Sequence, residues 1–357
     1  MTKCRGMLTA IVMTWSASSN AFAQTSAPDA AIPGPTDTAG GLEEIVVTAT
    51  RREERLQDIP VTVTAITANT INASSITEVR NLTQVVPGFT GNRTASVIQP
   101  VIRGIGSSGL SVGDESNVAT YIDGIYQPDP FSTSLELVEV ERVEVLRGPQ
   151  GTVFGRNATG GLINVITPDP SFDTRGRAAL RYGRTRNDAN EYDLRAYLTG
   201  PLTETFAADF AGLYRKREGW VKDLVRGGGL GGSRVIDVRS KLLFRPSDSS
   251  KIILTGQYAD QNSSINATQP RLNNTVARNH PAVILPTKPW QSSLTEKPSI
   301  DYERYNLSLR TQFELGDVNL ETSTGYMHTT GAQNADIDST NIAVQFITFP
   351  LKVEAIS

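Results

Sequence analysis

Three glycines and a carboxylate near residue 104 have the spacing of a dinucleotide-binding motif. Gly104, Gly106 and Gly109 follow the order GxGxxG in "VIRGIGSSG", and Asp123 lies about 20 residues beyond the first of them. Such a motif binds a pyrophosphate only when a helix begins directly after the glycines, because the helix N-terminus holds the phosphates. The following residues, "LSVGDESN", are polar and lack helical periodicity. We therefore expect a glycine-rich loop with tight turns here.

Side chains that could catalyse a reaction or bind a metal are few. The chain has two histidines, His280 and His328, and neither has a second ligand at metal-binding spacing. Its single cysteine, Cys4, lies near the N-terminus, and no Ser/His/Asp arrangement can be justified from the sequence. The sequence therefore predicts no catalytic residue, no metal site and no cofactor.

The charges argue against a further class of function. The 357 residues include 34 Lys or Arg and 37 Asp or Glu, which gives a net charge of −3. A nucleic-acid-binding protein needs a basic stripe that neutralises phosphates. This balance gives no reason to expect a nucleic-acid partner, while the length allows two ordinary domains.

The N-terminus has the features of an export signal. A basic start precedes a short apolar core over Met7–Trp15, and "AFA" at residues 21–23 fits a cleavage site. The apolar core is too short to span a bilayer as a helix. We expect residues 1–23 to be a signal peptide that is removed. Residues 24–43 are rich in Pro, Gly and Ala, which predicts a flexible leader.

A strand-like segment follows the leader in "LEEIVVTATRRE", residues 42–53. Its β-branched residues favour a strand, but so short a strand needs a partner. Main-chain hydrogen bonds to the edge of a partner's sheet would hold it, and alternate side chains would give selectivity. The alternative is that the segment forms the first strand of the next domain. The partner-binding residues that we expect are Glu44, Ile45, Val46, Val47, Thr48 and Ala49.

The next residues predict a mixed α/β domain. The stretch "VTVTAIT", residues 61–67, alternates with the period of a strand. In "SITEVRNLTQVVPGF", Ser75 and Glu78 have capping-box spacing, and the Pro-Gly pair is a stop signal. We therefore expect a helix that begins after Ser75.

The most specific pattern lies between Val118 and Pro168. The stretches "ATYIDGIY", "RVEVL" and "LINVIT" predict strands, separated by Asp-Gly, Arg-Gly-Pro and Gly-Gly turns. Together with "VIRG" at residues 101–104, they resemble the plug domain of TonB-dependent outer-membrane receptors. The residues that carry this resemblance are Gly104, Asp123, Gly124, Glu144, Gly148, Pro149, Gly155, Gly160, Gly161 and Asn164.

The remaining residues alternate as the strands of a transmembrane β-barrel do. In "NEYDLRAYL", Tyr192 and Leu194 share one face while Asp193 and Arg195 share the other. About seven such stretches occur in series, joined by short and long connections in turn, and "TFPLKVEAIS" begins another. A soluble β-sandwich with one wet face would give the same alternation. The series of strands behind an export signal favours a barrel in lipid, with its charged face inward.

The resemblance implies an α+β plug domain, residues 51–170, followed by an antiparallel transmembrane β-barrel, residues 171–357. A barrel that encloses a plug needs about 22 strands. We therefore expect only the first strands of the barrel to be present, and the chain to be a fragment. The expected location is the outer membrane of a Gram-negative bacterium, with the barrel in contact with its lipid.

The resemblance also implies a function. Residues 44–50 would be the TonB box, bound by TonB with its inner-membrane energising complex, and a pull on the box would remodel the plug. The substrate would be a scarce nutrient, most often a ferric siderophore or a similar chelate, bound through loops at Ser107–Asn117 and Tyr126–Thr133. Arg103 and Arg147 match family positions that latch the plug to barrel glutamates, which would lie in the missing part. A passive porin, a signalling receptor and a barrel hydrolase are the alternatives.

Overall fold

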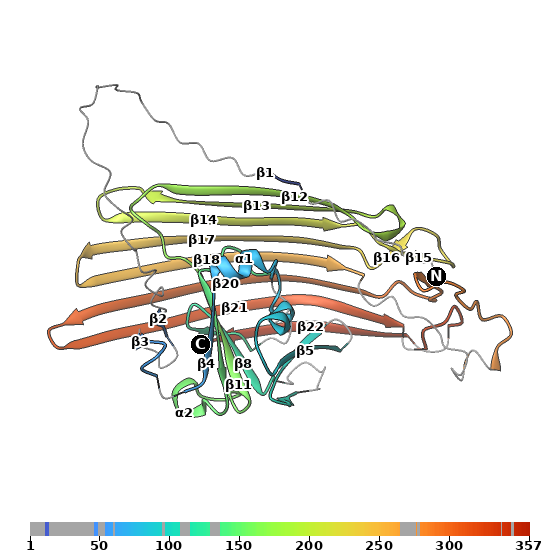
Figure 1. Cartoon of the computed structure of the whole chain (residues 1–357), viewed down its shortest axis with the longest axis horizontal. Helices are drawn as coiled ribbons and strands as arrows, with labels where there is room; N and C mark the ends of the chain where they lie inside the picture. The colour runs from blue at the N-terminus through green and yellow to red at the C-terminus, as the bar shows by residue number, and fades with distance from the viewer. Residues whose placement is uncertain are drawn as a thin grey trace, which may run out of the picture.

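The computed structural model consists of a long sheet, which we call the wall, and a smaller domain, the plug, that lies against one face of it (Figure 1). The structure describes residues 11–13, 46–48, 54–59, 61–94, 97–107, 115–128, 136–264, 276, 279–336, 338–343 and 346–357. We call the described residues from 46 to 170 the plug and those from 171 onwards the wall. Most of the predicted signal peptide and all of the predicted leader lie outside the described residues.

The wall is antiparallel, and each of its long strands pairs with the next long strand of the chain. The short strand β1 (Ile11–Met13) pairs with the other edge of β12. The predicted stretches correspond to β12 through β21, and β22 is the further strand that the sequence indicated. The long strands are β12 (Arg175–Arg184), β13 (Asn190–Pro201), β14 (Phe206–Arg217), β17 (Ser233–Ser247), β18 (Ser250–Ser263), β20 (Ser299–Leu315), β21 (Val318–Asp336) and β22 (Phe346–Ile356).

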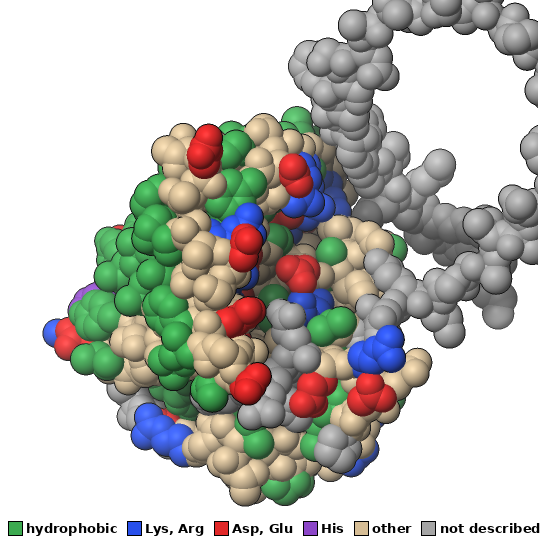
Figure 2. All heavy atoms as spheres, turned by 90° about the vertical axis from the view of Figure 1, so that its left-hand side faces the viewer, with side chains coloured by type: hydrophobic (Ala, Val, Ile, Leu, Met, Phe, Trp, Pro, Cys, Tyr) green, Lys and Arg blue, Asp and Glu red, His purple; other side chains and the backbone are tan. Residues whose placement is uncertain are grey.

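The two faces of the wall differ in polarity, as the alternation predicted. On β13, Leu194 is 49% exposed and Leu198 is 57% exposed, whereas Asp193 between them is 4% exposed. On β17, Asp237 and Lys241 are each 1% exposed. Figure 2 looks along the strands and shows hydrophobic side chains gathered over one side of the molecule. An apolar outer face with a charged inner face is the arrangement that a barrel in lipid requires.

The three shortest connections of the wall lie at one end of it. The turns at residues 202–205, 248–249 and 316–317 are short and lie at the left in Figure 1, and the connections at 218–232 and 264–298 are long and lie at the right. In outer-membrane barrels the short turns face the periplasm and the long loops face the outside. The left end of the wall in Figure 1 is therefore the periplasmic end.

The plug is built around a five-stranded sheet in the order β4-β10-β11-β8-β9. Only the β11–β8 pair is parallel. The central strands are buried on both faces, since Val143 and Ile163 pack in one apolar cluster and Leu146 and Leu162 in another. Such burial explains why these strands have near-continuous apolar sequences. The strands are β4 (Val63–Thr67), β8 (Val118–Ile122), β9 (Ile125–Tyr126), β10 (Arg142–Arg147) and β11 (Gly161–Ile166).

The helix that we expected after Ser75 is wrong in position and in type. The α-helix α1 (Ala68–Ala73) precedes that segment, and the segment itself forms the 3₁₀ helix η1 (Val79–Gln84). Ser75 has a φ of 51°, which is not the extended geometry of an N-cap residue. The cap forms one turn later, where the side chain of Asn81 accepts from the backbone N–H of Glu78 at 3.1 Å.

The remaining elements are short. Among the described residues, no helix is long and apolar enough to cross a membrane. These elements are β2 (Val46–Val47), β3 (Glu54–Arg55), β5 (Phe89–Thr94), β6 (Val97–Ile102), β7 (Ile105–Gly106), α2 (Gly151–Phe154), η3 (Arg186–Asp188), β15 (Val221–Asp223), β16 (Gly229–Leu230) and β19 (Gln291–Ser292).

Candidate functional site

The predicted partner-binding strand is described at three of its residues. Val46 and Val47 form β2, which pairs with β3. Val47 is fully buried in an apolar cluster of the plug, whereas Val46 is 39% exposed. The strand therefore places one side chain against the plug and the preceding one towards solvent. The predicted residues Glu44, Ile45 and Ala49 lie outside the described residues.

Thr48 fastens this strand to a buried carboxylate of the plug. Its backbone N–H donates to Glu144 Oε1 at 2.9 Å, and its hydroxyl donates to Oε2 at 3.1 Å. The amide of Asn164 donates to Glu144 Oε2 and to the Thr48 hydroxyl, at 3.2 Å each. Arg142 Nε donates to Glu144 Oε1 at 2.9 Å and balances its charge. Glu144 is 0% exposed, so these contacts compensate for its loss of water.

The Thr48 site joins residues that are distant in the sequence. Glu144 and Asn164 lie opposite each other on β10 and β11, and Thr48 approaches from the N-terminal segment. The sequence singled out all three residues but gave no sign of their contact. A partner strand that took up β2 would have to break the Thr48 contacts, which would leave the buried Glu144 with fewer donors.

The glycine and aspartate residues of the plug pattern lie in tight turns. Asp123 and Gly124 join β8 to β9 with φ of 49° and 82°, the geometry that an Asp-Gly pair supplies in a hairpin. At Gly161, a Cβ would lie 2.3 Å from the carbonyl oxygen of Leu146, so no other residue fits without a shift. The other members of the pattern lie at the ends of β6, β10, α2 and β11, and they are Gly104, Gly148, Pro149, Gly155 and Gly160.

The two predicted latch arginines have different surroundings. Arg147 donates to the hydroxyl of Thr64 at 2.5 Å, and Arg103 is exposed in the turn after β6. Neither forms a carboxylate pair among the residues that the structure describes. Arg147 ends β10 next to α2, which lies at the border of the plug furthest from the wall (Figure 1). The pairing with barrel glutamates stays a prediction.

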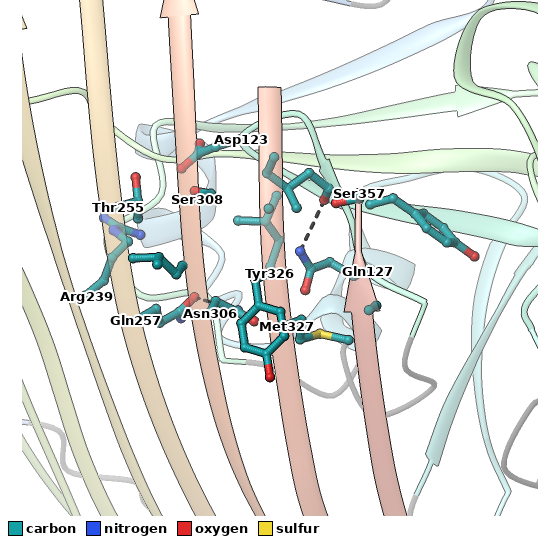
Figure 3. Close-up of a pocket in the computed structure, with 16 residues that line it drawn as sticks. Asp123, Gln127, Arg239, Thr255, Gln257, Asn306, Ser308, Tyr326, Met327 and Ser357 are labelled. Atoms are coloured by element: carbon teal, nitrogen blue, oxygen red, sulfur yellow. Dashed lines mark hydrogen bonds between the residues drawn. The ribbon is translucent and has the colours of Figure 1, made fainter. Parts of the chain in front are cut away.

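A cavity lies between the plug and the wall, beside the turn that follows β8. Figure 3 shows residues that line it, which include Asp123 and Gln127 of the plug and Arg239, Gln257 and Asn306 of the wall strands. Its volume of about 30 Å³ suits a water molecule and is far too small for a chelate.

The predicted substrate loops fall mainly outside the described residues. At their described ends, the backbone N–H of Asn117 donates to the hydroxyl of Ser107 at 2.8 Å. The described part of the chain also holds no group of three His, Cys, Asp or Glu side chains that could bind a metal ion.

Polar contacts between plug and wall form a set of residues that the sequence analysis missed. Arg239 of β17 donates to the carbonyl oxygens of Val138 and Glu139, at 3.1 and 3.2 Å. Arg215 of β14 pairs with Glu136 of the plug at 2.5 Å. Burial raises the pKa of Glu136 to about 7, although Arg215 favours the ionised form. The alternation had placed charges on the inner face, but it could not indicate their partners.

Two comparisons by sequence agree with this geometry. Residues 55–162 match the family model of the TonB-dependent receptor plug domain. A pesticin receptor from Yersinia pestis is 28% identical over 207 residues, which are 57% of this chain and 30% of the receptor. An iron-regulated outer membrane virulence protein from Vibrio cholerae is 26% identical over 267 residues, which are 68% of this chain and 39% of that protein. The chain thus spans between 30% and 39% of the length of these relatives.

Solved structures share the same arrangement of plug and wall. The ferric yersiniabactin uptake receptor from Yersinia pestis superposes with a TM-score of 0.64 at 22% identity, covering 77% of this chain and 42% of the receptor. The unliganded ferric citrate transporter gives a TM-score of 0.63 at 17% identity, covering 78% of this chain and 41% of the transporter. Residues 55–162 therefore match the plug domain of the TonB-dependent receptors, and the chain has the fold of such a plug followed by part of an outer-membrane β-barrel.

Proposed function

We propose that the protein takes part in TonB-dependent uptake of an iron chelate across the outer membrane. The plug would gate the barrel, and residues 44–49 would receive the pull from TonB. The outer membrane has no supply of ATP, so uphill transport has to draw on work delivered across the periplasm. The observation that carries the proposal is the position of the short strand β2 and of Thr48 after it, which are held on the plug by a few hydrogen bonds and by the burial of Val47.

The place of this strand in the fold supports the proposal. In Figure 1, β2 and β3 lie on the side of the plug towards the short turns of the wall, which mark the periplasmic end. TonB would approach from that side. Among the described residues, β2 pairs only with β3, and a partner strand that adds by main-chain hydrogen bonds would first have to release the contacts of Thr48 with Glu144.

The relatives support an iron compound as the substrate. They include proteins named as a hemin receptor, 32% identical over 133 residues, and a ferrioxamine B receptor, 29% identical over 167 residues. The small cavity between plug and wall does not hold such a compound. Substrate binding would instead use the loops Ser107–Asn117 and Tyr126–Thr133 with the long connections of the wall.

The test is uptake by cells that carry the gene at full length with Ile45→Pro. Proline removes a backbone donor from the partner-binding strand and disrupts pairing with TonB. The probes are radioiron-labelled ferrioxamine B, ferric yersiniabactin and labelled hemin, each measured for surface binding and for uptake. We expect Ile45→Pro to abolish energy-dependent uptake of the probe that the receptor takes, with surface binding retained.

The matched control is Thr38→Pro, which lies in a leader segment that already contains several prolines. It should leave uptake unchanged. If Ile45→Pro takes up the probe as fast as Thr38→Pro, residues 44–49 do not couple the receptor to TonB, and a passive porin becomes the better account.

A further inference from the structure

A buried lysine of the wall contacts two separate segments of the plug. Lys241 lies on β17 and is 1% exposed. Its Nζ lies 2.9 Å from Asp123 Oδ2 and 3.6 Å from Asp169 Oδ1. It also donates to the carbonyl oxygens of Thr167 and Pro168, at 3.2 and 3.0 Å. An ammonium group this deeply buried needs such acceptors to compensate for its loss of water.

The two segments are the β8–β9 turn and the exit of the chain from the plug towards β12. They are also joined to each other, because Asp123 accepts from the backbone N–H and the hydroxyl of Thr167 at 2.8 and 2.6 Å. Burial opposes ionisation of Asp123, yet Lys241, Arg310 and Arg239 together hold its pKa well below the usual range. Asp123 is therefore ionised, and its charge depends on cations from the wall.

A second lysine nearby differs in its surroundings. Lys251 of β18 contacts Asp169 at 2.7 Å, but its side chain is 37% exposed. Arg310 of β20 also pairs with Asp169. An ion pair in contact with water contributes little, while removal of one partner of a buried pair leaves an uncompensated charge. The two lysines are thus a matched pair, of which only Lys241 is buried.

The position of Lys241 relative to the plug sheet suggests which part of the sheet it holds in place. The strand β4 forms one edge of that sheet and follows the partner-binding strand in the chain, whereas β8 and β9 form the other edge. A pull on residues 44–49 would reach β4 first, while Lys241 holds the opposite edge at Asp123. We propose that Lys241 is a positioning residue that seats the plug on the wall and keeps its far edge in place while the near edge is pulled. This inference rests on the proposed function, since it assumes that the plug is pulled.

The role of Lys241 can be tested by measuring how well the plug blocks passage of a solute through the receptor. The complete receptor is expressed in cells that lack TonB, and sensitivity is measured to a glycopeptide antibiotic too large for general porins. At equal amounts in the outer membrane, we expect Lys241→Met to raise sensitivity about tenfold or more, because Asp123, whose side chain is only 10% exposed, loses the cation that contacts it. The matched variant Lys251→Met should change sensitivity less than about twofold. Lys241→Arg, which keeps the charge, should stay close to the parent.

Neutralising Asp123 separates a seating role from a general loss of structure. Adding Asp123→Asn to Lys241→Met removes the uncompensated charge, while Asp169 keeps its pairs with Lys251 and Arg310, so the double variant should seal again. A double variant as leaky as Lys241→Met, or a single variant no leakier than Lys251→Met, overturns the proposal. If Lys241→Met alone does not assemble in the membrane, the double variant decides in the same way, because the proposal requires it to assemble and to seal.

The outcome is independent of the uptake experiment. The seal is measured without TonB, so it does not depend on energy transfer to residues 44–49. If Lys241→Met leaks and uptake by Ile45→Pro is unaffected, the proposed function is refuted, and only the role of Lys241 in holding the plug on the wall remains. Loss of uptake in Ile45→Pro with no leak in Lys241→Met would refute the seat alone.

Discussion

The carboxylate of Glu144 illustrates how much one side chain contributes to holding β2, the strand for which we propose partner binding. It is fully buried, and its oxygens accept hydrogen bonds from Thr48, Asn164 and Arg142. The strand at residues 46–48 is therefore held in place by a few directed contacts and by the burial of Val47. A strand held by so few contacts could be released by a pull, as the proposed coupling role requires.

Substitution of Thr48 should loosen the strand without unfolding the plug. Thr48→Val keeps the shape of the side chain but removes the hydroxyl that contacts Glu144 and Asn164. We expect the docked state to lose about 1 to 2 kcal/mol. Amide hydrogen exchange at Val47 and Thr48 of the purified receptor should become about tenfold faster, since 1.4 kcal/mol corresponds to a factor of ten. Thr48→Ser keeps a hydroxyl and should exchange like the parent, and equal protection in Thr48→Val would rule out this account.

The contact between Glu136 and the wall predicts a dependence on pH. Burial raises the pKa of Glu136 to about 7, with Glu78 adding to the rise and Arg215 and Arg195 opposing it. The folded protein then binds more protons than the unfolded chain between the ordinary pKa of 4.5 and 7. Its free energy of unfolding should therefore fall as pH rises through this window, by at most about 1.4 kcal/mol per unit, and level off above it.

Thermal unfolding of the receptor in detergent at pH 5 and pH 8 measures this dependence. The matched variant is Glu136→Gln, which does not titrate but keeps a polar side chain at the same place. The parent should lose more stability than Glu136→Gln between the two pH values. The same pH dependence in both proteins would show that other groups cause it.

At the level of elements, the strands of the wall were predictable and the helices of the plug were not. Successive side chains of a wall strand face lipid and plug in turn, so apolar and polar residues alternate in the sequence. The helix α1 has the sequence "ANTINA", whose β-branched and Asn residues are poor helix formers, and it is stabilised by packing of Ile71. The contact between Thr48 and Glu144 joins residues that are 96 positions apart, and no local pattern in the sequence predicts it.

The outer face of β13 predicts a cost for a charge in lipid. Leu194→Arg places a cation on the apolar face of the strand, where Leu194 is 49% exposed. The free energy of unfolding in lipid vesicles should fall by about 2 kcal/mol or more. Leu202→Arg is the matched control, because Leu202 is 64% exposed in a short turn at the end of the wall. A similar loss in both variants would mean that the face of β13 does not lie in lipid.

For the whole molecule, the sequence indicated the two domains and their order, but not how they meet. The plug pattern and the alternating strands are local features, so both could be identified from the chain alone. The contact between them includes an apolar cluster of Val138 with wall residues and single cations of the wall that contact carboxylates and carbonyl oxygens of the plug. These cations include Arg215, Arg239 and Lys241. Their inward direction followed from the alternation, while their partners depend on how the two domains pack.

The pairing of each wall strand with its successor has a consequence for the order of folding. Contacts between wall strands that are joined by the short turns at 202–205, 248–249 and 316–317 close short loops, so their entropic cost is small and they form early. The plug sheet differs, because residues 63–67 have to meet residues 142–147, and β8 has to align in parallel with β11. We therefore expect the hairpins of the wall to form first and the plug to acquire its final order later, against cationic side chains that are already in place.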